Sequence, residues 1–123
     1  MGDFTSAAVL QDLQALAPVE AVHGNMDEPA LKADLPAQRV VKAGGLRIGL
    51  VHDVGPAAGR SARLVAAFPG CDLIAYGHSH LPEVVREDRT WIVNPGSPTE
   101  RRRAPGHTMA VLRSGRPELV RLD

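Results

Sequence analysis

The chain has 123 residues and a mass of 13.1 kDa, which fits a single domain spanning residues 1–123. Its 14 Lys and Arg balance 14 Asp and Glu and only 3% of residues are aromatic, so no nucleic-acid polymer is expected as a specific partner. No apolar run is long enough to cross a bilayer, so no membrane partner is expected, and the lone Cys71 excludes an intrachain disulfide and suits a reducing cytoplasm.

Hydrophobic periodicity predicts two helices and several short strands. A helix is expected over residues 5–17, where good N-cap types precede an apolar face, and a short strand over residues 19–23. Further along come a hairpin of 38–42 with 46–52, a helix over 61–68, a buried strand over 73–76, a hairpin of 83–86 with 90–93, and a hairpin of 109–112 with 118–122. Hairpins combined with two helices predict a layered α/β sandwich.

Polar residues recur directly after the predicted strands, where layered α/β folds commonly place ligand sites. The most specific of these segments is Gly77-His78-Ser79-His80, which follows a buried strand. Glycine lets the chain turn sharply there, so both imidazoles can face one cavity and offer nitrogen lone pairs to a divalent cation. The alternative from the residues alone is a polar turn with two solvated histidines.

Three other candidates have ordinary structural explanations beside the functional one. His52 ends a predicted strand, where a histidine is usually hydrogen-bonded to the backbone. Asn25 sits in a Gly-Asn turn but also carries an amide oxygen that can coordinate a metal. Asp3, by default, is a flexible terminal residue or the N-cap of the first helix.

The order of these segments is more informative than any one of them. Gly2-Asp3, Gly24-Asn25-Met26-Asp27, the strand-end His52, Gly77-His78-Ser79-His80 and Asn94-Pro95-Gly96-Ser97 follow one another along the chain. This order resembles the calcineurin-like metallophosphoesterases, and among them the short phosphodiesterases of the YfcE-like group. The resemblance covers nearly the whole chain.

The resemblance implies a four-layer α/β/β/α sandwich and a phosphodiesterase or phosphatase activity on small phosphodiester or phosphomonoester substrates. A metal-activated water would be the nucleophile, so no certain catalytic side chain is expected. By position, Asp3 is similar to the carboxylate that bridges two divalent metal ions. Asn25, His52 and His78 are similar to the other ligands of the second ion, and His80 to a ligand of the first. These ligand types suit manganese, nickel, iron or zinc alike.

The sequence also departs from the family pattern. The family begins with a strand ending in Asp-x-His, which precedes the Gly2-Asp3 position and has no counterpart in residues 1–123. We therefore expect an N-terminally truncated sandwich that retains one metal ion well, catalyses poorly, and self-associates as a homo-oligomer through an exposed sheet edge. Met26 stands where the wider superfamily has a proton-donating histidine, and a thioether has no proton to donate.

The run of arginines over residues 101–103 is either a solvated basic loop or a phosphate-binding segment, with Arg101 and Arg103 as the candidate contacts. The missing Asp-x-His and Met26 also permit a different function. The retromer scaffold subunit shares this fold, so a non-catalytic protein-interaction scaffold is the alternative to an enzyme.

Overall fold

The computed structural model describes residues 7–16, 19–22, 24, 35, 37–52, 55–79, 81–97, 104 and 106–123, with the backbone alone at residues 7–9, 12 and 13. In chain order the elements are α1 (Ala7–Leu16), β1 (Gln38–Ala43), β2 (Leu46–Val51), α3 (Arg60–Ala67), β3 (Leu73–Ala75), β4 (Glu83–Glu87), β5 (Thr90–Asn94), β6 (Thr108–Arg113) and β7 (Arg116–Arg121). Both predicted helices and all three predicted hairpins are present, with bounds within two residues of those expected.

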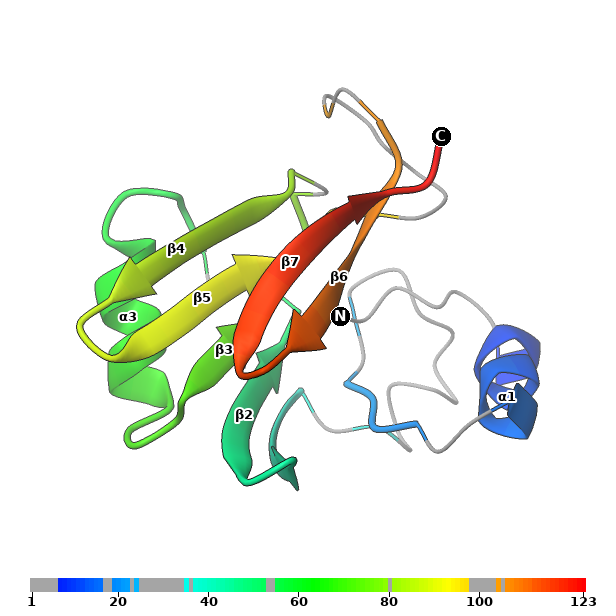
Figure 1. Cartoon of the computed structure of the whole chain (residues 1–123), viewed down its shortest axis with the longest axis horizontal. Coiled ribbons are helices and arrows are strands. Elements are labelled where there is room, and N and C mark those ends of the chain that lie inside the picture. The colour runs from blue at the N-terminus through cyan, green and yellow to red at the C-terminus, as the bar shows by residue number, and fades with distance from the viewer. Residues whose placement is uncertain are drawn as a thin grey trace.

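Five strands form the central sheet, in the order β1-β2-β3-β5-β4 (Figure 1). The three inner strands β2, β3 and β5 run parallel, and the outer strands β1 and β4 pair antiparallel to them. The carboxyl ends of the parallel strands therefore meet at one edge of the sheet, which is where ligand sites form in such sheets.

Each face of the central sheet is covered by a different layer. On one face, Leu64 and Phe68 of the α3 segment pack with Ile74 and Ile92 into a buried cluster. The close approach of α3 depends on Gly49 in β2, because a Cβ there would lie 2.7 Å from the Phe68 ring. The contact between β2 and the α3 segment thus lies three residues before His52, which directly follows β2.

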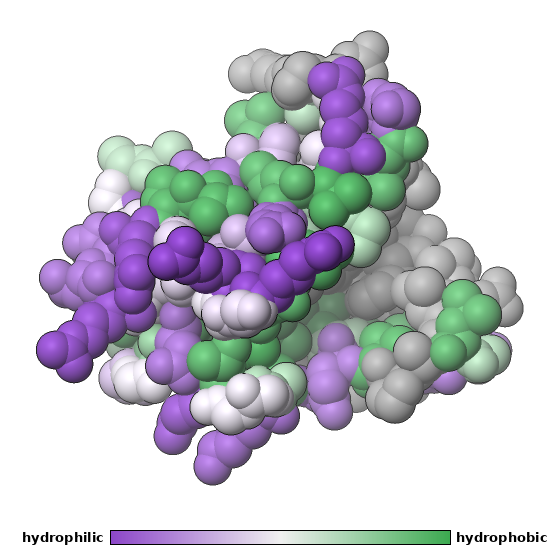
Figure 2. Space-filling model, viewed as in Figure 1, coloured by the Kyte–Doolittle hydropathy of each residue, from purple (hydrophilic) through white to green (hydrophobic). Residues whose placement is uncertain are grey.

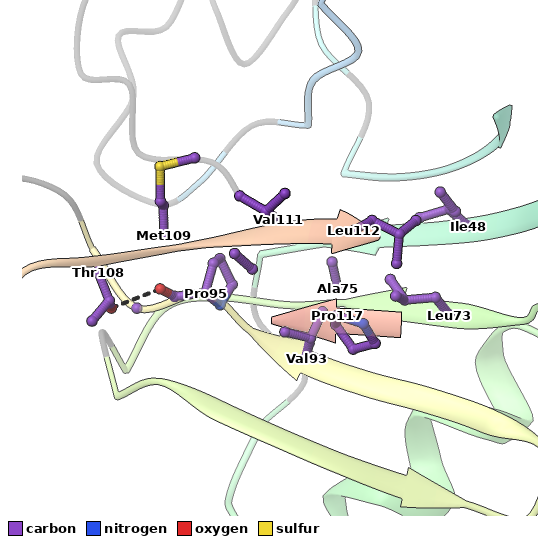
Figure 3. A pocket seen from close by; sticks show the side chains of 12 residues that line it. Ile48, Leu73, Ala75, Val93, Pro95, Thr108, Met109, Val111, Leu112 and Pro117 are labelled. Carbon is purple, nitrogen blue, oxygen red and sulfur yellow. Dashed lines mark hydrogen bonds between the residues drawn. The ribbon is translucent and has the colours of Figure 1, made fainter. Parts of the chain in front are cut away.

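The other face of the sheet is covered by a second, two-stranded sheet of β6 and β7. Between the two sheets lies a cavity of about 320 Å³ (Figure 3). The described residues that line it are apolar apart from Thr108, and they are Ile48, Leu73, Ala75, Val93, Pro95, Gly96, Thr108, Met109, Ala110, Val111, Leu112 and Pro117. None of the described residues that line it is a histidine or a carboxylate, so the cavity is separate from the pair His52 and His78.

Tight turns with positive φ join the hairpin strands. Gly44 and Gly45 have φ of 57° and 78°, as a two-residue hairpin turn with the matching twist requires. The β6–β7 turn uses Ser114 at 50° and Gly115 at 78° in the same way. These are the turn positions that the glycines in the sequence predict.

The prediction of a strand over residues 19–23 is wrong for the part that the structure describes, because residues 19–22 belong to no strand. A strand needs a hydrogen-bonded neighbour, and no strand of the described residues pairs with this segment. Its apolar side chains are nevertheless buried: Val22 joins the core on the β6–β7 side of the sheet, and Ala21 packs with Leu10 of α1. The apolar residues of this segment therefore indicated correctly that it is buried, but they did not indicate that it pairs with a strand.

The expected layered α/β sandwich is confirmed. The helix α3, the central sheet and the β6–β7 sheet stack in that order, and α1 lies on the side of the molecule opposite α3 (Figure 1). None of the helices within the described ranges is long and apolar enough to span a membrane.

Candidate functional site

The candidate site lies at the edge of the central sheet where β2, β3 and β5 end. Backbone pairing continues beyond the strands, because the Gly77 amide donates to the His52 carbonyl at 2.9 Å. The Tyr76 amide likewise donates to the Val93 carbonyl at 3.0 Å. The three segments that leave the sheet are therefore held side by side at their first residues.

His52 and His78 face each other across this edge. Nδ1 of His78 lies 3.3 Å from Nε2 of His52, with the ring centroids 5.3 Å apart and the rings nearly perpendicular. His52 is only 5% exposed, whereas His78 is half-buried. Two ring nitrogens in this arrangement can share one proton or direct both lone pairs at one cation. The structure thus brings together two of the five predicted metal ligands, which come from segments 26 residues apart.

The backbone at His78 is in an unusual conformation. Its φ is 75°, and the Ser79 amide donates to the Gly77 carbonyl at 3.0 Å. A three-residue turn with a positive central φ is rare, and for a residue with a Cβ it costs about 1–3 kcal/mol. Such strain persists only where surrounding contacts impose it, and it is typical of functional positions.

Asn94 is a member of this site that the sequence did not single out as a contact. Its side chain is fully buried at the end of β5 and reaches the turn that carries His78. Nδ2 donates to Ser79 Oγ at 3.1 Å and lies 3.5 Å from the Gly77 carbonyl oxygen. An asparagine that ends an apolar buried strand is the signal that could have revealed it, because buried amides require partners.

A second polar cluster closes the base of the loop that carries His78. The Tyr76 hydroxyl donates to Glu83 Oε1 at 2.7 Å and accepts from Arg60 Nη1 at 3.1 Å. Burial, followed by the Glu83 hydrogen bond, raises the pKa of the Tyr76 hydroxyl above its ordinary value of 10.0. Because Tyr76 precedes the loop and Glu83 follows it, their hydrogen bond ties the two ends of residues 77–82 together.

The remaining predicted site residues, Asp3, Asn25, His80, Arg101 and Arg103, lie outside the described residues, as does Met26. Within the described ranges, no group of three or more His, Cys, Asp and Glu side chains could hold a metal ion. His107, to which no role was given, pairs with Asp123 at 3.0 Å next to the C-terminus. Hydrogen bonds from His107 lower the pKa of the Asp123 carboxyl.

Parallel strands that deliver paired histidines to one sheet edge define an α/β fold with a candidate site at the strand ends. Residues 1–115 match the calcineurin-like phosphoesterase superfamily domain. The chain belongs to the calcineurin-like phosphoesterase superfamily, and the resemblance inferred from its motifs is confirmed.

Three similar proteins illustrate the range of the family. A probable metallophosphoesterase of Methanothermobacter thermautotrophicus is 37% identical over 100 residues, which make up 80% of this chain and 58% of that protein. The crystal structure of Vps29 from Chaetomium thermophilum is 31% identical with a TM-score of 0.66, covering 79% of this chain and 51% of that one. A structure described as a novel archaeal phosphodiesterase is 20% identical with a TM-score of 0.78, covering 98% of this chain and 79% of that one. This last likeness shows the fold.

The chain spans about half the length of the curated relatives that it matches. The family membership and the α/β phosphoesterase fold are properties of residues 1–123.

Proposed function

We propose that this domain is a metal-dependent phosphoesterase that hydrolyses small phosphodiester or phosphomonoester substrates. The observation that carries the proposal is the 3.3 Å approach of His78 Nδ1 to His52 Nε2 at the carboxyl edge of the sheet. Zinc–nitrogen bonds are about 2.0–2.1 Å, so two imidazoles on one tetrahedral ion have nitrogens roughly 3.3–3.4 Å apart. The separation of the two ring nitrogens therefore supports a shared cation.

Four side chains are proposed to hold one ion, namely Asp3, Asn25, His52 and His78, and Asp3 and His80 are the candidates for a second. With four ligands against two, residues 1–123 by themselves hold the first ion more tightly and turn over slowly. Manganese, nickel, iron and zinc all accept this mixture of carboxylate, amide and imidazole ligands. When bound, the ions supply a nucleophilic water at neutral pH and a Lewis acid for the phosphoryl oxygens.

The chain's own residues contribute orientation and charge. The His52 carbonyl accepts from the Gly77 amide at the end of the sheet, and the His78 ring lies against the His52 ring, so the pair needs little reordering when an ion binds. Arg101 and Arg103 are proposed to contact the substrate phosphate, since guanidinium groups pair bidentately with phosphate oxygens. The single cysteine, Cys71, is buried and unpaired, which supports a cytoplasmic location.

The test measures metal binding and hydrolysis in the same variants. The affinity for Mn²⁺ and Zn²⁺ is measured by titration calorimetry, and turnover is followed with an activated aryl phosphodiester and added Mn²⁺. His52→Ala and His78→Ala should each weaken ion binding by about 100-fold or more and abolish turnover. The reason is that each variant lacks one ligand of the same ion. His107→Ala is the matched control, since the His107 ring is engaged by Asp123.

Two results would overturn the proposal. One is a wild-type chain that captures no ion at saturating Mn²⁺ or Zn²⁺. The other is hydrolysis by His52→Ala and His78→Ala at the rate of the His107→Ala control. The melting temperature of each variant is recorded, and His52→Gln replaces His52→Ala if the smaller side chain prevents folding at this buried position.

A second candidate function is a non-catalytic interaction module. The similarity to Vps29 favours it, as do exposed apolar side chains on β7 and just beyond it, where Leu119 is 41% and Leu122 is 47% exposed. In Figure 2, hydrophobic surface over β4, β5 and β7 is interrupted by hydrophilic side chains. Ion capture without any metal-dependent hydrolysis across manganese, nickel and zinc would favour this module over the enzyme.

A further inference from the structure

The strained turn at His78 needs an external restraint. Its positive φ is unfavourable for any residue with a Cβ, and the hydrogen bond from the Ser79 amide to the Gly77 carbonyl closes a turn of only three residues. Left to itself, such a segment relaxes to a more favourable backbone, and the His78 ring would then turn away from His52. The contacts that prevent this relaxation decide where Nδ1 of His78 points.

Asn94 makes contacts that oppose this relaxation. Its Nδ2 donates to Ser79 Oγ at 3.1 Å and lies 3.5 Å from the Gly77 carbonyl oxygen, so one amide group touches both flanks of His78. Ser79 Oγ also accepts from the Leu81 amide at 3.3 Å, which carries the restraint further along the loop. The Asn94 side chain is fully buried, so water does not compete for these bonds.

The Asn94 amide is itself fixed by a second turn. Its Oδ1 accepts from the Gly96 amide at 3.0 Å, which sets the orientation in which Nδ2 faces the His78 turn. The second turn is tied to β6, because Thr108 Oγ1 donates to the Pro95 carbonyl at 2.7 Å (Figure 3). The Thr108 amide also donates to the Ser97 carbonyl at 3.0 Å. Asn94 therefore joins two turns, one of which is anchored on the second sheet.

We propose that Asn94 is a positioning residue, which holds the strained Gly77–Ser79 turn so that Nδ1 of His78 stays directed at Nε2 of His52. The proposal rests on the proposed function only in its consequence, namely that loss of this restraint weakens ion binding. The restraint itself is a property of the folded chain without any ion. A buried asparagine that merely satisfies its own polar groups would stabilise the fold without governing the conformation of His78.

The test compares Asn94→Ala and Ser79→Ala with a matched control on the same strand. Thr90→Val is that control: Thr90 begins β5, and its hydroxyl donates to the Cys71 carbonyl at 2.9 Å. The control thus removes one part-buried hydrogen bond between a side chain and the backbone, at the opposite edge of the sheet. Ser79→Thr serves as the rescue variant, because it keeps the hydroxyl that Asn94 contacts.

Three readouts are taken at one fixed pH. Amide hydrogen exchange at Ser79 should accelerate about tenfold or more in Asn94→Ala and in Ser79→Ala, because the turn opens locally. The ring ¹⁵N shifts of His52 and His78 should change together in these two variants. Zn²⁺ affinity, measured by calorimetry, should fall about 10- to 100-fold, as is usual when a partner that orients a ligand is removed. Thr90→Val and Ser79→Thr should match the wild type in all three.

The proposal is overturned if Asn94→Ala lowers the melting temperature as Thr90→Val does while Ser79 exchange and the ring shifts stay at wild-type values. A wild-type chain that binds no Zn²⁺ would refute the metal-site proposal, and the exchange and ring measurements would still decide the role of Asn94. If Asn94→Ala does not fold, Ser79→Ala and its Ser79→Thr rescue decide the same question from the other end of the hydrogen bond.

Discussion

Replacement of Gly49 by alanine should destabilise the domain through a steric conflict with Phe68. A Cβ at Gly49 would lie 2.7 Å from both Cγ and Cδ1 of the ring, whereas carbon atoms in contact prefer about 3.5–4.0 Å. The ring would have to move by about 1 Å. It has little room to do so, because Phe68 is 3% exposed and Leu64 and Ile74 in the same cluster are fully buried.

The size of the effect follows from this overlap. Overpacking of this kind costs about 1–3 kcal/mol, and for a chain of this length a loss of 2 kcal/mol lowers the melting temperature by about 6–10 °C. Urea unfolding can be followed by fluorescence, because Trp91 is the single tryptophan and packs against the core between the sheets. Gly45→Ala separates the causes, since a Cβ at Gly45 meets open space and should cost only about 1 kcal/mol through its positive φ.

A double-mutant cycle with Phe68→Leu decides whether the clash is the reason. The smaller side chain costs about 1 kcal/mol alone as a buried large-to-small change, but it should recover at least about 1 kcal/mol of the loss in Gly49→Ala, so the two changes are not additive. Two results would refute the steric reasoning. One is losses in the two single variants that add to within about 0.5 kcal/mol, as losses at independent sites do. The other is a Gly49→Ala variant as stable as the wild type. Non-additive losses would show that the Phe68 ring, at the end of α3, limits the space at Gly49 in β2.

Two further outcomes follow from the site. The pKa of Tyr76 is raised by burial and by Glu83, so the contribution of Tyr76 to stability should be constant below pH 10.0 and should be lost as the pH rises through the higher folded value. Tyr76 is the only tyrosine, so absorbance at 295 nm reports it alone. Glu83→Gln should lower the apparent pKa, and a reversible ionisation midpoint at or below pH 10.0 in the folded wild-type chain would contradict the burial argument. Gly96→Ala combines a φ of 77° with overlap on Thr108 Oγ1, and should cost about 2–4 kcal/mol in urea unfolding. A Gly96→Ala variant as stable as the wild type would show that the second turn is not anchored as described.

The helices and hairpins were predictable because they depend on apolar patterns and turn residues that are close together in the sequence. Alternating apolar residues around Gly44 and Gly45 predict the first hairpin, and apolar periodicity predicts α3. The motif around His78 could be placed at a strand end for the same reason. What these patterns report is which face of a segment is buried, and this explains why residues 19–22 were predicted as a strand although they pair with none.

The assembly of the site was less predictable because it depends on strand order. The sequence predicts β4 and β5 as a hairpin, but it does not say that β5 rather than β4 lies beside β3. That choice brings Asn94 next to the turn of His78 and lets the Tyr76 amide reach the Val93 carbonyl. Contacts between segments distant in sequence are decided by tertiary packing, which no local propensity records.

Strand order also explains how two histidines on loops can form a site of fixed geometry. The hydrogen bonds of the parallel ladder continue past β2 and β3, so the first residue of each loop is ordered when the sheet forms. The backbone entropy of His52 and Gly77 is therefore lost on folding, and binding of the proposed ion need not order these residues again. Gly49→Ala should consequently weaken ion binding only as far as it displaces β2. A change at Asn94 acts on the turn itself, and should separate ion affinity from the stability of the sheet.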